Sequence, residues 1–430
     1  MDNFKLFYRM GGRALKLELS NSKKNKGMLD LFFTLLVFAF FLRLAIGIGY
    51  YNEQDTLWYR QWALSLPDGL FNVYARADAI DLDYPPIYLF FLYILGWIFK
   101  FVGADCHQYL LMFLMKLWPI LADMACGIAL FAVFRKTSVK TGIIAASLWL
   151  FNPSVLFNSS FWGQTDQLMC LLLLVSFVSL EREKPLLACI LFAIAGMTKY
   201  QCLFFTPVFL TELFVKYRVS TFFKGILSAA LTVAAVFLPF MIGSKNLFLF
   251  LDVYLKGQGR YPYCTLNAYN IYGIFGLNWK VDSKAIIGGL SLYALSMFLV
   301  VLAILAVIAI YLFAKRRSVW VIGFWFMNTL FMFMTRMHER YQFVALIFIL
   351  MAALTLKNRG FFYGFLGLSF ITFVNQAIPM FSWNSKESLF SIYYGDLMFT
   401  FSFLNLVLYI ITSYMCFKFL FTEKAKELET

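Results

Sequence analysis

The chain has 430 residues, of which 62% are hydrophobic and only 14% are charged. A soluble domain is about 45–50% apolar and about 25% charged, so this composition excludes an ordinary soluble protein. The net charge of +14 does not indicate a nucleic-acid-binding protein, because the basic residues gather in an N-terminal segment and in short connections between apolar runs. That distribution is typical of cytoplasmic loops that face anionic membrane lipids.

The seven cysteines include no Cys-x-x-Cys pair, and most of them lie in apolar runs. We therefore expect buried small side chains and no disulfide framework or metal site. No cofactor is predicted, and no motif indicates the alternative, a divalent metal.

Residues 1–27 hold seven Lys and Arg against two acidic residues, with apolar residues between them. This pattern favours a cytoplasmic amphipathic segment on the membrane surface. From residue 28 onward, apolar runs repeat at the length of about 20 residues that crosses a hydrocarbon core. The first run is too long for the core of a cleavable signal. We predict an all-α polytopic membrane protein with about twelve (eleven to thirteen) transmembrane helices, near residues 28–50, 109–134, 141–159, 167–181, 185–198, 201–215, 219–242, 284–313, 318–335, 341–356, 360–379 and 396–420.

The run at residues 87–103 decides the orientation of every later span. If it crosses the membrane, the basic loop at 135–140 and all later basic loops fall outside the cell. If it lies along the membrane or re-enters, these loops all fall on the cytoplasmic side with the N-terminus. Because Lys and Arg mark cytoplasmic loops, we favour the second arrangement and keep the first as the alternative.

The favoured arrangement predicts a single transmembrane domain over residues 28–421 and a tail at 422–430, with both termini in the cytoplasm. The external segments are then 51–108, 243–283 and 380–395. The expected location is the cell membrane, or the endoplasmic reticulum membrane of a eukaryotic cell.

On this topology the polar motifs gather on the external side. Each also has a plainer interpretation: Thr165 or Asp166 caps a helix, Asn267 and Asn270 close turns, and His338 is a satisfied polar group. Their common side nevertheless favours one shared pocket. The motifs are the stretch from Asp55 to Pro86, Trp162-Gly-Gln-Thr-Asp166, Thr198-Lys-Tyr-Gln201, Thr265-Leu-Asn-Ala-Tyr-Asn270 and Arg336-Met-His-Glu-Arg-Tyr341.

Several cations stand on a side that should be poor in positive charge, which favours a bound anion. Arg336 and Arg340 suit phosphate, because a guanidinium makes two parallel hydrogen bonds. Lys116 lies inside an apolar run, on the same helix face as Asp123. Ionisable groups at that depth normally face a protein interior or a wet cavity. Lys116 is the closer of the two to the external side, whereas Asp123 fits a structural role.

These groups suit the transfer of a sugar from a lipid phosphate. A carboxylate deprotonates the acceptor hydroxyl, and cations stabilise the leaving phosphate as its charge grows. No phosphate-binding loop, Gly-x-Ser-x-Gly turn or metal-spaced cluster suggests a competing chemistry. The aromatic residues expected to stack on sugars are Trp58, Tyr59, Trp62, Tyr84, Trp162, Tyr200, Tyr261, Tyr263 and Tyr269.

The motifs also resemble a known family. Asp55, the aromatic stretch after it and Asp83-Tyr-Pro-Pro86 look like the first luminal loop of the GT-C glycosyltransferases, which are multispan enzymes that use polyprenyl-phosphate sugars. The Asp-Tyr-Pro-Pro string is similar to that of the dolichyl-phosphate-glucose-dependent glucosyltransferases of N-glycan assembly. The Trp-Gly-Gln-x-Asp, Asn-Ala-Tyr-Asn and Met-His-Glu-Arg-Tyr strings resemble mannosyltransferases related to the second mannosyltransferase of GPI-anchor synthesis, including bacterial and archaeal relatives.

The resemblance implies an inverting hexosyltransferase that moves mannose, or else glucose, from a polyprenyl phosphate to a lipid-linked glycan or cell-surface polymer. It implies that Asp55 is the base and that the first loop carries helices parallel to the membrane. Glu53 and Gln54 precede Asp55 where a second aspartate would complete a two-acid metal pattern. Donor phosphate is expected at Arg336, Arg340, Lys199 and Lys116. Sugar contacts or loop organisation are expected of Asp83, Tyr84, Trp162, Gln164, Asp166, Asn267, Asn270, His338 and Glu339.

A transporter or flippase of a lipid-linked sugar is the alternative function. It would use the same aromatic residues and cations without a catalytic base. Transporters often show paired halves, and none is visible in this sequence. A non-catalytic scaffold is a third possibility, but it leaves the clustering of polar motifs unexplained.

Overall fold

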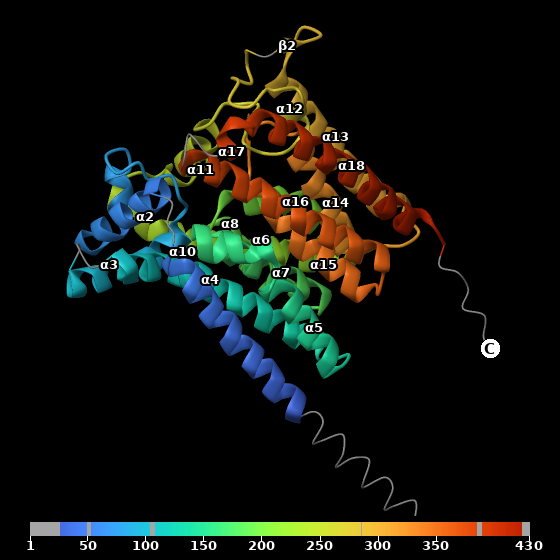
Figure 1. Ribbon diagram of the computed structural model, residues 1–430, viewed down its shortest axis with the longest axis horizontal. Coiled ribbons are helices and arrows are strands. Elements are labelled where there is room, and N and C mark those ends of the chain that lie inside the picture. The colour runs from blue at the N-terminus through green and yellow to red at the C-terminus, as the bar shows by residue number, and fades with distance from the viewer. Residues whose placement is uncertain (1–25, 50–52, 104–107, 285, 385–388, 424–430) are drawn as a thin grey trace, which may run out of the picture.

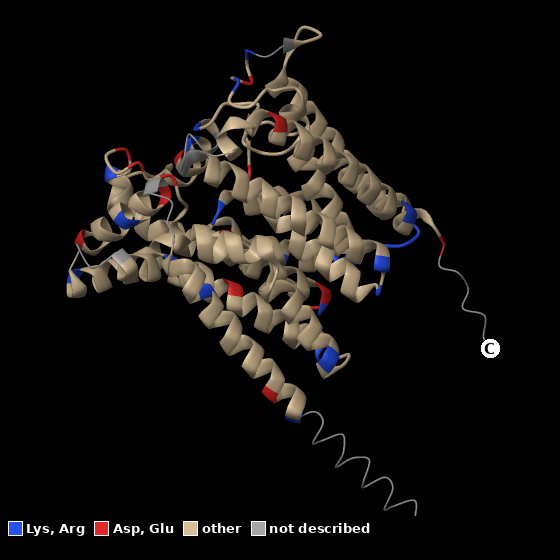
Figure 2. Cartoon of the chain, in the orientation of Figure 1, with Lys and Arg blue, Asp and Glu red and all other residues tan. Residues whose placement is uncertain are grey.

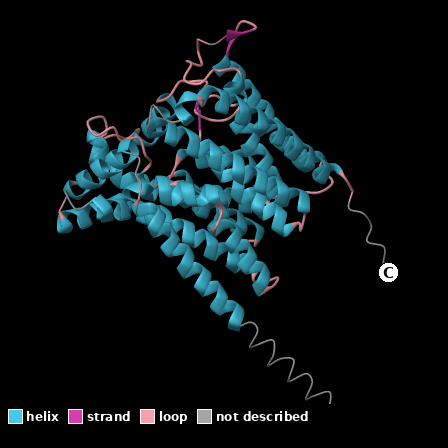
Figure 3. Cartoon of the chain, in the orientation of Figure 1, coloured by secondary structure: helices cyan, strands magenta, loops and turns pink. Residues whose placement is uncertain are grey.

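The computed structural model describes residues 26–49, 53–103, 108–284, 286–384 and 389–423. Most of the predicted basic segment 1–27 and tail 422–430 lies outside these residues. The described ranges are nearly all helical, and their strands form two short two-stranded sheets (Figure 3). The prediction of an all-α protein is therefore confirmed in its main feature.

The first helix, Lys26–Ile48, leads to the helical segment that the sequence predicts to be external, called the first external segment below. That segment contains α2 (Glu53–Ser65) and α3 (Pro86–Val102), which lie beyond the far end of the first helix (Figure 1). α3 begins at a proline, which fits the first turn of a helix. α3 packs against α2 and the turn after it so closely that a Cβ on Gly96 would collide with the carbonyl oxygen of Ala63. The two connecting turns are η1 (Leu66–Asp68) and η2 (Val73–Arg76).

The span predicted at 141–159 is a broken pair of helices. α5 (Val139–Leu150) is followed by α6 (Pro153–Leu156) and a π-helical turn, η3 (Phe157–Trp162), with a bend of 52° at the break. Asn152 stabilises the restart, because its side chain accepts from the amide of Ser154 at 2.9 Å. Pro153 follows and occupies the first helical position, where a backbone N–H would have no partner within the helix, so its absence costs nothing.

The prediction is also wrong at the start of the span 284–313, because its helix begins only at Leu292. The residues before it form a hairpin of β2 (Ile286–Ile287) and β3 (Leu290–Ser291). Ser291 then caps α13 by accepting from the amide of Ala294. The remaining helices are α4 (Gln108–Phe134), α7 (Asp166–Glu181), α8 (Pro185–Gly196), η4 (Tyr200–Phe205), α9 (Thr206–Lys216), α10 (Val219–Ser244), α11 (Leu249–Gly259), α12 (Ile271–Ile274), α13 (Leu292–Phe313), α14 (Val319–Phe333), η5 (Tyr341–Val344), α15 (Ala345–Thr355), α16 (Arg359–Asn384), α17 (Leu389–Ile392) and α18 (Tyr394–Phe421).

Six helices in the described residues are long and apolar enough to cross a membrane, or seven if the bent pair counts as one span. Four shorter apolar helices accompany them, among them α8 with 12 residues. At 1.5 Å per residue, 12 residues cover only about 18 Å of a hydrocarbon core about 30 Å thick. The protein is a multi-pass membrane protein, and the count of about twelve spans stays a prediction.

Burial separates inner helices from outer ones. α14 and α15 are apolar around their whole circumference and almost fully buried, as expected for the centre of a bundle. The first helix, α10, α13 and α18 instead expose large apolar side chains such as Phe33, Leu231, Phe298 and Ile410. These outer faces have the character of surfaces in contact with lipid acyl chains.

The two ends of the bundle differ in charge. Basic residues mark the connection after α4, the start of α16 and the end of α18, which lie at the lower right of Figure 2 together with the start of the first helix. α2, α3, α11 and α12 lie at the opposite end. The connection between α13 and α14 reaches the end of α18, where Lys315 Nζ lies 2.8 Å from Glu423 Oε1.

Candidate active site

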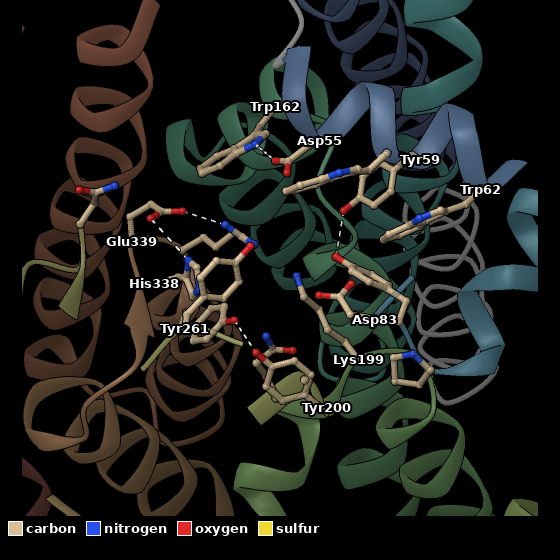
Figure 4. A pocket seen from close by; sticks show the side chains of 18 of the residues that line it. Asp55, Tyr59, Trp62, Asp83, Trp162, Lys199, Tyr200, Tyr261, His338 and Glu339 are labelled. Carbon is tan, nitrogen blue, oxygen red and sulfur yellow. Dashed lines mark hydrogen bonds and ion pairs between the residues drawn. The ribbon is translucent and has the colours of Figure 1, made fainter. Parts of the chain in front are cut away.

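The distant polar motifs converge on one cleft at the end of the bundle that carries α2 and α11. Figure 4 shows this cleft from close by. α2 supplies four residues at positions that share one helix face: Asp55, Trp58, Tyr59 and Trp62. The other lining residues are Asp83, Tyr84, Pro85, Trp162, Lys199, Tyr200, Gln201, Gly257, Tyr261, Asn267, Trp279, His338, Glu339, Arg340 and Tyr341.

Asp55 is held by two donors from the Trp-Gly-Gln motif. Its Oδ2 accepts from Trp162 Nε1 at 2.8 Å and from Gln164 Nε2 at 2.7 Å. Trp162 ends the π-helical turn η3, and the next residue, Gly163, has φ +85°, a left-handed conformation that glycine adopts without strain. π-Helical turns occur frequently at functional sites. Here the turn fixes the direction of the indole, and the indole fixes the carboxylate.

Two cations surround a buried carboxylate on the same side of the cleft. Lys199 forms an ion pair with Asp166, and Arg340 Nε lies 4.0 Å from the other oxygen of Asp166. Arg340 also donates from Nη1 to Glu339 Oε1 at 2.8 Å, and its guanidinium stacks over the Trp162 ring at 5.2 Å. Its buried Nε makes no hydrogen bond within the described residues. Asn158 supports the cluster by donating to Asp166 Oδ2 at 3.1 Å.

His338 and Glu339 enter the cleft from a short parallel ladder. β4 (Met337–His338) pairs with β1 (Thr265–Leu266), which joins two motifs that are far apart in the sequence. Burial lowers the pKa of His338 well below its usual value, and nearby Arg340 and Lys199 act in the same direction. Burial raises the pKa of Glu339, and Arg340 opposes this shift. The imidazole is therefore neutral near pH 7.

The first external segment forms an aromatic wall. Tyr59 and Tyr84 share a hydrogen bond of 2.9 Å between their hydroxyls, and Trp62 donates to the carbonyl of Ile80 at 2.8 Å. Asp83 is paired with Arg260 at 3.0 Å. Burial raises the pKa of Asp83, and the Arg260 guanidinium opposes this rise.

Two residues predicted to bind the donor phosphate do not line the cleft. Lys116 donates to the carbonyls of Gly47 at 2.9 Å and Phe161 at 2.7 Å, so it holds helices together beneath the site. Arg336 pairs with Asp282 at 2.8 Å and lines a separate apolar cavity. These partners could not be predicted, because nothing in the apolar run around Lys116 or in the basic motif around Arg336 indicates them.

Three further predicted residues lie close to the cleft without lining it. Gln164 and Asp166 support Asp55 and Lys199 from behind, as described above. Asn270 caps α12 by accepting from the amide of Tyr272, which is the plainer role considered for it. Asn267 lines the cleft, and its carbonyl also accepts from Asn375 at 2.6 Å.

Seven of the nine aromatic residues expected to stack on sugars line the cleft. Tyr263 and Tyr269 do not, and Tyr269 is fully buried. Sequence analysis missed Trp279, which follows an ordinary turn and belongs to none of the motifs. It also missed Arg260, whose pairing with Asp83 joins the first external segment to the second.

Within the described residues, no three His, Cys, Asp or Glu side chains are grouped so that they could hold a metal ion. The cleft carboxylates are instead engaged with cations or amide and indole donors. The expectation that the reaction needs no metal stays a prediction.

A comparison with family models gives one result. Residues 56–252 match the ALG6, ALG8 glycosyltransferase family. That family consists of membrane glycosyltransferases that use dolichyl-phosphate sugars. The match runs from α2 into α11, which includes Trp162 and Lys199 and ends before Asn267 and His338. It supports a GT-C glycosyltransferase and a hexosyltransferase. No curated protein gave a match.

Proposed function

We propose that this protein transfers a hexose from a polyprenyl-phosphate sugar to a lipid-linked glycan or a cell-surface polymer, with inversion at the anomeric carbon. Asp55 is the general base. Lys199 and Arg340 bind the donor phosphate. The family match supports the donor class and the reaction type.

The proposal depends most on Trp162, because this residue contacts both the proposed base and a cation of the proposed phosphate site. Its indole N–H holds Asp55, and its ring face carries the guanidinium of Arg340. A carboxylate and a guanidinium fixed on one indole present opposite charges to the same small volume. An acceptor hydroxyl at the carboxylate and a phosphate at the guanidinium would then flank one anomeric carbon.

The chemistry follows from this placement. Asp55 removes the proton of the acceptor hydroxyl, whose oxygen forms a bond to the anomeric carbon. The bond between that carbon and the phosphate oxygen breaks, and polyprenyl phosphate leaves with its electron pair. Arg340 and Lys199 stabilise the charge that grows on the phosphate. Asp166 keeps both cations in place without occupying the cleft itself.

The charge difference between the two ends of the bundle supports the proposed membrane orientation. The end with basic connections faces the cytoplasm, so both termini lie there and the cleft opens on the external or luminal side. α3 lies along that surface, with Ile94, Trp97 and Phe101 exposed and Lys100 over the Trp97 ring. Tryptophan and lysine at the edge of an apolar helix face are typical of a membrane interface.

Glucose and mannose are the two candidate sugars. The string Asp83-Tyr-Pro-Pro86 and the family match support glucose, because that family contains glucosyltransferases. The motifs around Trp162, Asn270 and His338 resemble those of mannosyltransferases and support mannose. These sugars differ only in the configuration of one hydroxyl, so direct comparison of the two donors decides between them.

The test uses the purified full chain with radiolabelled polyprenyl-phosphate glucose or polyprenyl-phosphate mannose, together with a total lipid extract as the source of the acceptor. The enzyme releases free polyprenyl phosphate, whereas a transporter or flippase does not. Asp55→Asn should lower the rate by about 10²–10⁴-fold, the usual contribution of a general base. Asp68→Asn is the matched control, since Asp68 lies in the same external segment, is exposed and pairs with Lys100 outside the cleft. More than a tenth of the wild-type rate in Asp55→Asn would remove Asp55 from this role.

A further inference from the structure

Trp279 differs from every other aromatic residue that lines the cleft. It is 40% exposed, whereas the other lining aromatic side chains are buried or half-buried. It lies between α12 and the β2–β3 hairpin, at the end of the molecule opposite the basic connections (Figure 1). An exposed indole at the rim presents a flat apolar face to whatever enters from the aqueous side.

The backbone at Trp279 is strained. Its φ is +58°, a left-handed conformation that is unfavourable for a residue with a large side chain. The surrounding structure maintains it, since the Trp279 amide donates to the carbonyl of Thr265 at 3.0 Å. Strained residues of this kind gather at ligand-binding sites. The strain here directs the indole into the rim.

A network centred on Asn267 holds the indole in one orientation. Asn267 Oδ1 accepts from Trp279 Nε1 at 3.1 Å, Tyr394 Oη at 2.8 Å and Asn278 Nδ2 at 2.9 Å. Tyr263 packs edge-on against Trp279, with 5.2 Å between ring centroids. Asn267 is nine-tenths buried or more and lines the cleft, and because three donors occupy its oxygen, its amide nitrogen is the side-chain group available to a ligand. His338 lies beside it through a backbone bridge.

A rigid aromatic face next to an amide donor and a neutral imidazole is suited to a neutral sugar. The C–H groups of a sugar ring pack on the indole, and its hydroxyls pair with Asn267 and His338. Lys199 and Arg340, the cations proposed for phosphate, lie near His338, so His338 is the member of this group that adjoins the phosphate site. No cation is among the hydrogen-bond partners of Trp279 and Asn267 within the described residues.

The other side of the cleft leads toward the lipid-facing surface. Tyr200 and Tyr341 share a hydrogen bond of 2.8 Å and line both the cleft and an apolar cavity of about 640 Å³. Leu203 and Tyr254 line both that cavity and a second apolar cavity. Apolar walls suit the isoprenoid chain of the donor, which leaves the rim at Trp279 to the acceptor.

We propose that Trp279, Asn267 and His338 form a subsite for an inner sugar of an oligosaccharide acceptor, one or more units away from the hydroxyl that is glycosylated. This proposal rests on the proposed function, because only a transferase has an acceptor. The binding of a neutral oligosaccharide can nevertheless be measured without catalysis. It assigns the acceptor to the class of glycans with at least two sugars.

The experiment measures binding of soluble oligosaccharides to the full chain in detergent. The probes are α-glucan, α-mannan and β-1,4-linked N-acetylglucosamine oligosaccharides of one to five units. At least one series should bind more tightly as its length exceeds one unit. Trp279→Ala should weaken the longer members by about tenfold, the effect of losing one aromatic packing contact. Trp279→Phe should stay within about threefold of wild type, because it keeps an aromatic face.

Trp97→Ala is the control variant, since Trp97 is an exposed tryptophan on α3 outside the cleft. It should bind like wild type. Equal affinity for Trp279→Ala and wild type, or no binding by any member of the panel, would overturn the subsite. Oligosaccharide binding that depends on Trp279, without any hexose transfer, would overturn the proposed function and leave the subsite intact. If Trp279→Ala transfers hexose with the same acceptor kinetics as wild type, the subsite is overturned and the proposed function stands.

Discussion

Two buried clusters of charge in this bundle resemble each other and differ in one respect. Arg43 and Asp123 form an ion pair of 2.7 Å, and both side chains are fully buried. Each nitrogen of the Arg43 guanidinium has a protein acceptor: Asp123, the carbonyl of Ala39 at 2.9 Å and the carbonyl of Leu150 at 2.7 Å. This cluster joins the first helix to α4 and α5 and lines none of the cavities described above.

The second cluster, Lys199, Asp166 and Arg340, is also buried, but its two cations line the cleft. Two cations share one central carboxylate. Each cluster keeps one buried polar atom without a hydrogen bond within the described residues, Asp123 Oδ1 in the first and Arg340 Nε in the second, so the difference between them is contact with the cleft. A buried charge is stable only when it is paired and hydrogen-bonded. The Arg43 cluster is closed, since it lines none of the cavities described above, and it holds the fold together. The Lys199, Asp166 and Arg340 cluster is open to the cleft, so its cations can bind an anionic ligand.

The largest expected effect tests the closed cluster. Arg43→Met leaves Asp123 as an uncompensated buried charge and should lower the free energy of unfolding by about 3–5 kcal/mol. Unfolding of the purified protein in detergent, followed by circular dichroism, measures this loss. The double variant Arg43→Met with Asp123→Leu should recover most of the stability, because it removes both charges. If the single variant is as stable as wild type, the closed cluster is not structural.

The next effect tests the open cluster. Arg340→Lys keeps the positive charge but loses the planar fork that binds phosphate, so kcat/KM for the polyprenyl-phosphate donor should fall by about 10²-fold. The unfolding temperature should change little. Arg336→Lys is the matched control from the same motif, because Arg336 pairs with Asp282 outside the cleft. Equal kinetic losses in the two variants would show that the open cluster has no special role.

The smallest effect concerns the titration of His338. Its pKa lies well below the usual 6.5, because the side chain is buried and Arg340 and Lys199 are near. It should therefore stay neutral as the pH falls through about 6.5, and its charge should not alter the transfer rate there. Rates of wild type and His338→Gln between about pH 5.5 and 8 should differ by a constant factor. An inflection near pH 6.5 in wild type alone would contradict this assignment.

The sequence predicts the helices well where an apolar run is bounded by polar residues, as it does for α7 and α10. It fails where tertiary contacts decide. Asn152 and Pro153 restart a helix inside an apolar run, and that restart breaks the predicted span at 141–159. The hairpin before Leu292 is equally apolar, and its only local signal is the Gly288-Gly289 turn, both of whose residues have positive φ; the prediction from apolar length overlooked it.

For the candidate site, the common side of the motifs on the predicted topology was enough to predict one shared pocket. Asp55, Trp162 and Arg340 lie together as expected. The partners of individual cations could not be predicted, because nothing local distinguishes Arg336, which binds Asp282, from Arg340, which faces the cleft. Trp279 was missed because its exposure and backbone strain are properties of the folded chain.

The π-helical turn at Phe157–Trp162 has a wider consequence. A π-helical turn carries one more residue than the α-helical turn it replaces, which rotates everything after it by about 100°. This turn sets the orientation of the Trp162 indole, which donates a hydrogen bond to the carboxylate of Asp55, 107 residues earlier in the chain. The alignment of Asp55 with Trp162 therefore depends on one extra residue in this turn, whose last member, Trp162, itself lines the cleft.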